Sequence, residues 1–160
     1  MLRVAWIFSL FLLALVLGVS YSHLLQWVPK ETLPANDFLT IHQVLLKQYR
    51  MGIGWMEGIA AIAVCSVAYL MRQNLRRFVL SLVTLLCLLF MIWIWAVQIN
   101  PINVAVNSWS ATSLPANWET VRSSWHQFHA IRFALAVVAF GTFTWAALDR
   151  RKPNPSLPTS

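Results

Sequence analysis

The sequence predicts an all-α protein: a four-transmembrane-helix bundle with a short helix in the first outer loop and a fourth span that extends outward. Of the 160 residues, 59% are hydrophobic and only 11% are charged, far from the balance of ordinary soluble proteins. A helix needs about 20 apolar residues to cross a hydrocarbon core of about 30 Å. Stretches that meet this need lie at about residues 4–28, 53–71, 78–98 and 118–148, the last with its apolar part at 130–148.

Because lipid offers the backbone no hydrogen-bond partner, these stretches should be helices. They form one domain over residues 1–152, and the proline-rich residues 153–160 form a disordered tail. The first stretch also fits a signal peptide, with Arg3 as its basic end and VSYS as a poor cleavage site. We favour an uncleaved span, because apolar residues continue through LLQWV.

The second span carries a seam of small residues at spacings of 4, 3, 4 and 3. Such seams let membrane helices approach closely, so Cys65 is predicted to be a packing residue. Neither Cys65 nor Cys87 belongs to a C-x-x-C pair, which argues against zinc or redox chemistry. The seam consists of Gly54, Gly58, Ala61, Cys65 and Ala68.

The third span ends at N-P-x-N, in which Pro101 acts as a helix breaker. Asn100 and Asn103 either form a simple turn or supply hydrogen bonds to a cavity. The fourth helix should begin near Asn117, a suitable N-cap residue.

Basic residues predict the orientation, since they are retained on the cytoplasmic side of bacterial membrane proteins. Four spans put one group of seven on the side of both termini: Arg3, Arg72, Arg76, Arg77, Arg150, Arg151 and Lys152. The other side carries Lys30, Lys47, Arg50, Arg122 and Arg132. We therefore expect an integral protein of the bacterial inner membrane with both termini in the cytoplasm. The net charge of +7 reflects these clusters and the lipid bilayer as partner, and does not indicate nucleic acid.

Ionisable residues gather on the predicted outer side. All four histidines fall there, as does Glu57, the only acidic residue within a predicted span. Ionisable residues at membrane depth usually face a bundle interior or a wet cavity, which makes them candidates for function. Along the fourth helix a stripe has spacings of 4, 3, 4 and 3, which confine it to an arc of about 80°. The stripe consists of Trp118, Arg122, Trp125, His129 and Arg132.

Glu57 is the expected carboxylate partner of Arg132 or Arg122, either as a structural ion pair or as a functional base. One carboxylate cannot satisfy the whole stripe, which favours a ligand cavity. Two interpretations of His23 stay open: an interior residue that forms hydrogen bonds, or a base. We expect His42 to be solvated, and His126 to lie at the edge of the stripe. No metal is expected, because the histidines lack the usual ligand spacings and two arginines would repel a cation.

The order of N-P-x-N, Trp118, Arg122, Trp125, His129 and Arg132, followed by an apolar span, resembles the family of small four-span membrane proteins that includes the fungal anthrone oxygenases. The resemblance implies oxidation of a phenolic anthrone by molecular oxygen, with no bound metal or other cofactor.

The implied reaction suggests a role for each residue of the stripe and for the other candidates. His129 or Glu57 would act as general base, with His23 as a further candidate. Arg122 and Arg132 would stabilise the enolate or phenolate. The aromatic substrate would lie on Trp118 and Trp125, near Asn100 and Asn103.

A second function class stays open: a non-enzymatic accessory or binding subunit of a membrane complex, which grips a lipid, a quinone or a partner helix. An enzyme should have an internal cavity beside Arg122 and His129. An accessory subunit should direct an apolar or aromatic face at its neighbour. The substrate, the partner proteins and the oligomeric state do not follow from the sequence.

Overall fold

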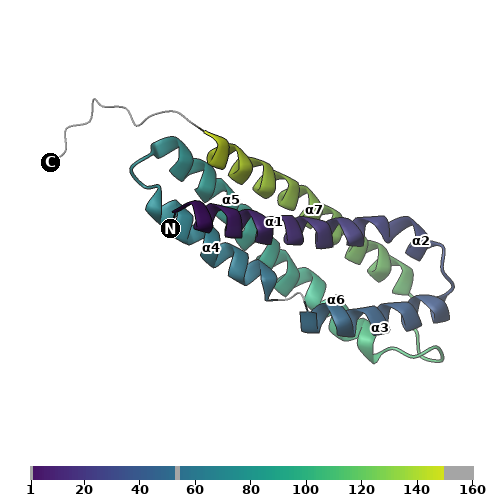
Figure 1. Ribbon diagram of the computed structural model, residues 1–160. Coiled ribbons are helices and arrows are strands. Elements are labelled where there is room, and N and C mark those ends of the chain that lie inside the picture. The colour runs from purple at the N-terminus through teal and green to yellow at the C-terminus, as the bar shows by residue number, and fades with distance from the viewer. Residues whose placement is uncertain (1, 53–54, 150–160) are drawn as a thin grey trace.

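The computed structural model describes the backbone of residues 2–52 and 55–149, and the side chains of residues 2–45 and 55–149 (Figure 1). The described residues are mostly helical and include no strand. The predicted disordered tail and Gly54 lie outside the described residues.

Four apolar helices pack together: α1 (Leu2–Leu25), α4 (Met56–Leu70), α5 (Leu75–Ile94) and α7 (Trp118–Leu148). We call them the four-helix core. The α1 helix packs against α4 and α7, and α5 also packs against both, so the four enclose a common interior. All four supply buried side chains to it, among them Leu13, Val64, Leu88 and Phe143. The start of α1 and the end of α7 lie at the same end of the core (Figure 1).

Among the described residues, three helical stretches are long and apolar enough to cross a membrane: Leu2–Glu31, Leu75–Ser108 and Trp118–Leu148. The α4 helix is apolar but has only 15 residues, or about 22 Å at 1.5 Å per residue. It is shorter than the predicted second span. Large apolar side chains such as Ile7, Phe11 and Leu86 point away from the core. These features fit a membrane protein.

Pro101 does not end the third helix, contrary to the prediction from N-P-x-N. After α5 the chain makes a π-helical turn, η1 (Trp95–Ile99), and then continues as α6 (Asn100–Ser108). The N–H of Asn100 donates to the carbonyl oxygen of Trp95, five residues back. Proline lacks the N–H that an α-helix needs and clashes with the preceding turn. The wider π turn accommodates it, with Pro101 in the first turn of α6.

At the end away from the termini, several elements form a layer that we call the end cap. It consists of α2 (Trp27–Glu31), α3 (Ala35–Gly52), α6 and the first turns of α7. Its own small apolar core contains Phe38, Leu39 and Val106. The cap exists because α7, with 31 residues, is about 46 Å long. That exceeds a hydrocarbon core of about 30 Å.

Only part of the small-residue seam of α4 faces the interior of the four-helix core. Ala61 and Ala68 are buried, but Cys65 is exposed. The prediction that Cys65 packs between helices is therefore wrong. The buried face of α4 is turned slightly from the seam and consists of Ala60, Ala61, Val64, Val67 and Ala68.

Candidate functional site

The inward face of α7 carries the predicted stripe. Arg122, Trp125, His129 and Arg132 are all buried, and Trp118 is half-buried. The exposed side of the same turns includes Gln127. The 4, 3, 4, 3 spacing therefore predicted the face correctly. Asn117 precedes the first turn, as expected, although its side chain makes no capping hydrogen bond.

Trp125 lies at the centre of a group that we call the Trp125 cluster. The cluster brings five helices together: His23 from α1, Lys30 from α2, His42 from α3, Asn103 from α6, and Trp125, His126 and His129 from α7. All four histidines of the chain thus surround one tryptophan.

The indole of Trp125 contacts every imidazole in the cluster. Its ring centroid lies 4.2 Å from that of His129 and 4.9 Å from that of His42. The corresponding distances to His126 and His23 are 5.0 and 5.4 Å. The Trp125 Nε1–H donates to Oδ1 of Asn103 at 2.8 Å, which ties α7 to α6. Asn103 therefore has a defined partner, whereas Asn100 is half-buried at the start of α6.

The expectation for His42 was wrong and that for His126 was incomplete. Both side chains are only 1% exposed. His42 packs between Phe38 and Trp125, and His126 stacks on Trp27 with ring centroids 6.0 Å apart. The reason is tertiary: α3 folds back over α6, and α2 covers α7.

Sequence reasoning also missed Lys30, which is 5% exposed with its Nζ 5.2 Å from the Trp125 ring centroid. A signal was present. His23, Trp27 and Lys30 are spaced 4 and 3, which places them on one helical face if the helix continues past Pro29. The structure shows that it does so with one interruption at Gln26, between α1 and α2.

The two arginines of the stripe each have a carboxylate partner. Arg132 pairs with Glu57, as predicted, and their side chains are 9% and 16% exposed. Arg122 pairs instead with Glu31, at 3.2 Å from Nε to Oε2. Arg122 also donates to the carbonyl oxygens of Lys30 and Leu33, at 3.3 and 3.1 Å, and its guanidinium lies over Trp118. These contacts hold α2 and the following loop against α7.

Three imidazoles of the cluster lack hydrogen-bond partners. Neither nitrogen of His42, His126 or His129 has one among the described residues. A buried polar atom left unpaired costs about 1–3 kcal/mol, so nearly all such atoms in native proteins have a partner or a bound molecule. Six such atoms in one place leave hydrogen-bonding capacity for water or another polar molecule. No three His, Cys, Asp or Glu residues of the described chain are arranged to hold a metal ion.

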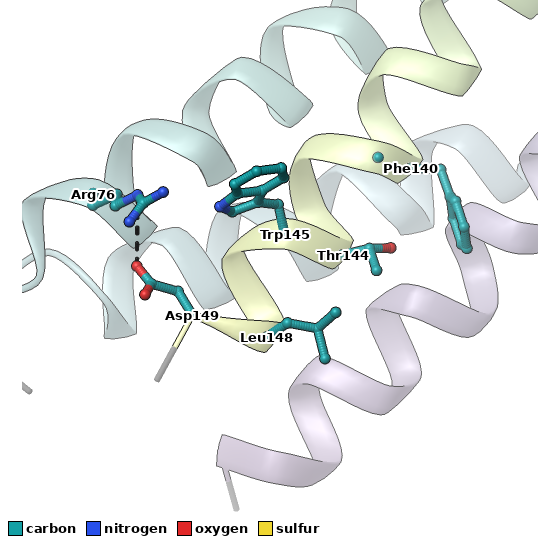
Figure 2. A pocket seen from close by; sticks show the side chains of 7 residues that line it. Arg76, Phe140, Thr144, Trp145, Leu148 and Asp149 are labelled. Atoms are coloured by element: carbon teal, nitrogen blue, oxygen red, sulfur yellow. Dashed lines mark ion pairs between the residues drawn. The ribbon is translucent and has the colours of Figure 1, made fainter. Parts of the chain in front are cut away.

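A pocket lies near the other end of α7, far from the Trp125 cluster (Figure 2). Its lining is Arg76, Phe140, Gly141, Thr144, Trp145, Leu148 and Asp149. The Arg76 guanidinium and the Asp149 carboxylate approach to 3.7 Å across it. None of the predicted site residues lies there, and Gly141 is about 18 Å along the helix from His129.

Comparisons of the chain with models of protein families, with curated proteins and with solved structures found no match. Within the Trp125 cluster, the imidazoles can accept or donate protons and the indole offers an aromatic face.

Stability should fall in acid because of His42. Burial, with a contribution from the nearby charge of Lys30, lowers its pKa to about 3, from 6.5 in the unfolded chain. Between these values the unfolded chain binds a proton that the folded chain does not. The free energy of unfolding therefore suffers no loss from His42 above pH 6.5, and it falls by about 1.4 kcal/mol per pH unit below that pH.

Unfolding of the detergent-solubilised protein at pH 6.5 and pH 5 should show this loss, and His42→Phe should be less sensitive by about 2 kcal/mol. The variant serves as control because other groups titrate equally in both proteins. Identical pH dependence in the two would contradict the assignment.

Proposed function

We propose that the chain is an integral protein of the bacterial inner membrane, in which α1, α4, α5 and α7 form a four-transmembrane bundle with both termini in the cytoplasm. The length and apolar character of three of these helices support the proposal. The α4–α5 turn lies at the end with the termini. It carries Arg72, and the first turn of α5 carries Arg76 and Arg77, as the positive-inside tendency requires. The end cap then faces the outer side.

We further propose that the Trp125 cluster binds a phenolic or anthrone-like aromatic molecule and promotes its oxidation without a cofactor. The observation that carries this proposal is the set of six buried imidazole nitrogens without partners, packed around an indole. A phenol or enol would satisfy several of them while its ring lies on aromatic neighbours. The reaction type is taken from the anthrone-oxygenase family, which the stripe of α7 resembles in sequence pattern, although no family model matches the chain.

The proposed reaction is balanced as anthrone plus O₂ giving anthraquinone plus water. His129 removes a proton from the activated ring carbon, because it is the most central imidazole and lies against His23 at 4.0 Å between centroids. The electron-rich anion then reacts with oxygen directly. Glu57 is occupied by Arg132, so we assign it an ion-pair role and give the role of base to His129.

Turnover of 1,8-dihydroxy-9-anthrone tests this function. We expect the purified protein to consume oxygen and form the anthraquinone above the spontaneous rate. His129→Phe and His129→Gln should each lower that excess by about 100-fold or more. Gln127→Ala, on the exposed side of the same helix, is the matched control and should keep full activity.

Absence of excess turnover in the folded wild-type protein would remove the oxygenase proposal. The alternative is an accessory or binding subunit. Native mass spectrometry of the same sample distinguishes it, since a retained lipid, quinone or partner protein would identify what the end cap binds.

A further inference from the structure

The charges around the Trp125 cluster do not balance. Arg132 is paired with Glu57 and Arg122 with Glu31. Among the side chains that the structure describes, Lys30 is the remaining cation in contact with the cluster, and none of their carboxylates forms an ion pair with it. The cluster therefore holds one positive charge more than its carboxylates neutralise.

The ionisable side chains that the charge of Lys30 acts on are four histidines: His23 of α1, His42 of α3, and His126 and His129 of α7. None of these four is an acid, and neither Asp37 nor Glu119, the acids of α3 and α7, forms an ion pair with Lys30. On the α6 side, Trp125 is bonded to Asn103, which is uncharged. Lys30 is only 5% exposed, and an ammonium without a counterion in such surroundings loses part of its hydration. The Trp125 ring offers only a partial substitute, through a cation–π contact.

The position of Lys30 is set by its backbone. Arg122 donates to the Lys30 carbonyl oxygen and also pairs with Glu31, so two neighbouring residues of α2 are attached to α7. This attachment keeps the Lys30 ammonium at the indole. The paired arginines therefore hold the helices in place, and Lys30 carries the positive charge that no carboxylate neutralises.

We propose that the Trp125 cluster binds a singly charged aromatic anion, a phenolate or carboxylate, with Lys30 as its counterion. Lys30 supplies one charge, the unpartnered imidazoles supply hydrogen bonds, and the rings of Trp125 and Trp27 supply apolar surface. The inference rests on the proposed ligand site but not on the reaction with oxygen. It assigns to Lys30 the stabilisation of the anion that the sequence suggested for Arg122 and Arg132.

Binding of 4-nitrophenol, compared with its neutral methyl ether 4-nitroanisole, tests the proposal. The phenolate absorbs visible light and the neutral phenol does not, so the spectrum reports the ionisation of the bound probe. We expect the wild-type protein to lower the pKa of bound 4-nitrophenol and to bind it more tightly than 4-nitroanisole. This measurement needs no variant. A bound phenol that ionises as in water would overturn the inference.

Variants of Lys30 give the second measurement. Lys30→Met should weaken binding of 4-nitrophenolate by roughly 30-fold or more, leave binding of 4-nitroanisole unchanged and raise Tm, since it removes a buried charge without a counterion. Lys30→Arg should restore part of the phenolate binding. Arg72→Met, at the other end of the molecule, removes the same net charge and should change neither probe.

The outcomes separate the two proposals. If neither probe quenches tryptophan fluorescence in the wild-type protein, the ligand site itself fails. If both probes bind and Lys30→Met affects them equally, the ligand site stands and the role of Lys30 is wrong. If Lys30→Met lowers Tm instead, Lys30 has a structural partner and the counterion role is also wrong.

Discussion

Trp125→Ala is expected to lower the free energy of unfolding by about 3–5 kcal/mol, the usual cost of truncating a buried tryptophan to alanine. Trp125 is 2% exposed and contacts residues from α1, α2, α3 and α6. Its removal takes away the shared surface on which the end cap is assembled. Backbone amides of α2 and α6 should therefore lose protection from hydrogen exchange more than those of α4.

Trp125→Phe is the matched control for this prediction. Phenylalanine keeps an aromatic ring in the cluster but loses the hydrogen bond to Asn103, so we expect a smaller cost, of about 1–3 kcal/mol for the unpaired amide oxygen. Chemical unfolding in detergent, followed by circular dichroism, measures both variants. Equal losses in Trp125→Ala and Trp125→Phe would show that the hydrogen bond, and not the ring, holds the end cap.

Glu57→Gln is expected to lower the free energy of unfolding by a similar amount, about 3–5 kcal/mol, because it leaves the buried guanidinium of Arg132 without a counterion. Both side chains are mostly buried, so water cannot screen the loss. The corresponding change at the other pair, Glu31→Gln, should cost less. Glu31 is 29% exposed, and Arg122 retains its bonds to two backbone carbonyl oxygens.

A double-mutant cycle tests the pair directly. The variant that combines Glu57→Gln with Arg132→Met carries neither charge, so it should be less destabilised than the sum of the single changes by about 2 kcal/mol or more. Hydrogen exchange or chemical unfolding gives the four free energies. If Glu57→Gln were as stable as the wild-type protein but inactive with the anthrone, Glu57 would be the base and His129 would not.

Local periodicity was enough to predict several features of the site. The 3.6-residue repeat of α7 identified the face that carries Arg122, Trp125, His129 and Arg132, since residues four and three apart share one side of any helix. The need of an inward arginine for a carboxylate identified Glu57 as the partner of Arg132 or Arg122, and the pair forms with Arg132. Pro101 was misjudged, because a π turn that absorbs a proline depends on the packing of its neighbours rather than on the local sequence.

The amino-acid sequence by itself determined the helical class, the apolar segments and the inward face of α7. These follow from composition and from spacing within single helices, which each segment carries alone. Only the tertiary structure decided that His42 and Lys30 are buried, that Arg122 pairs with Glu31, and that all four histidines meet at Trp125. Those contacts join residues up to 102 positions apart, as His23 and Trp125 are. They depend on how α2, α3 and α6 fold over the protruding turns of α7. No local pattern specifies that arrangement, because burial at the end cap is created by other parts of the chain.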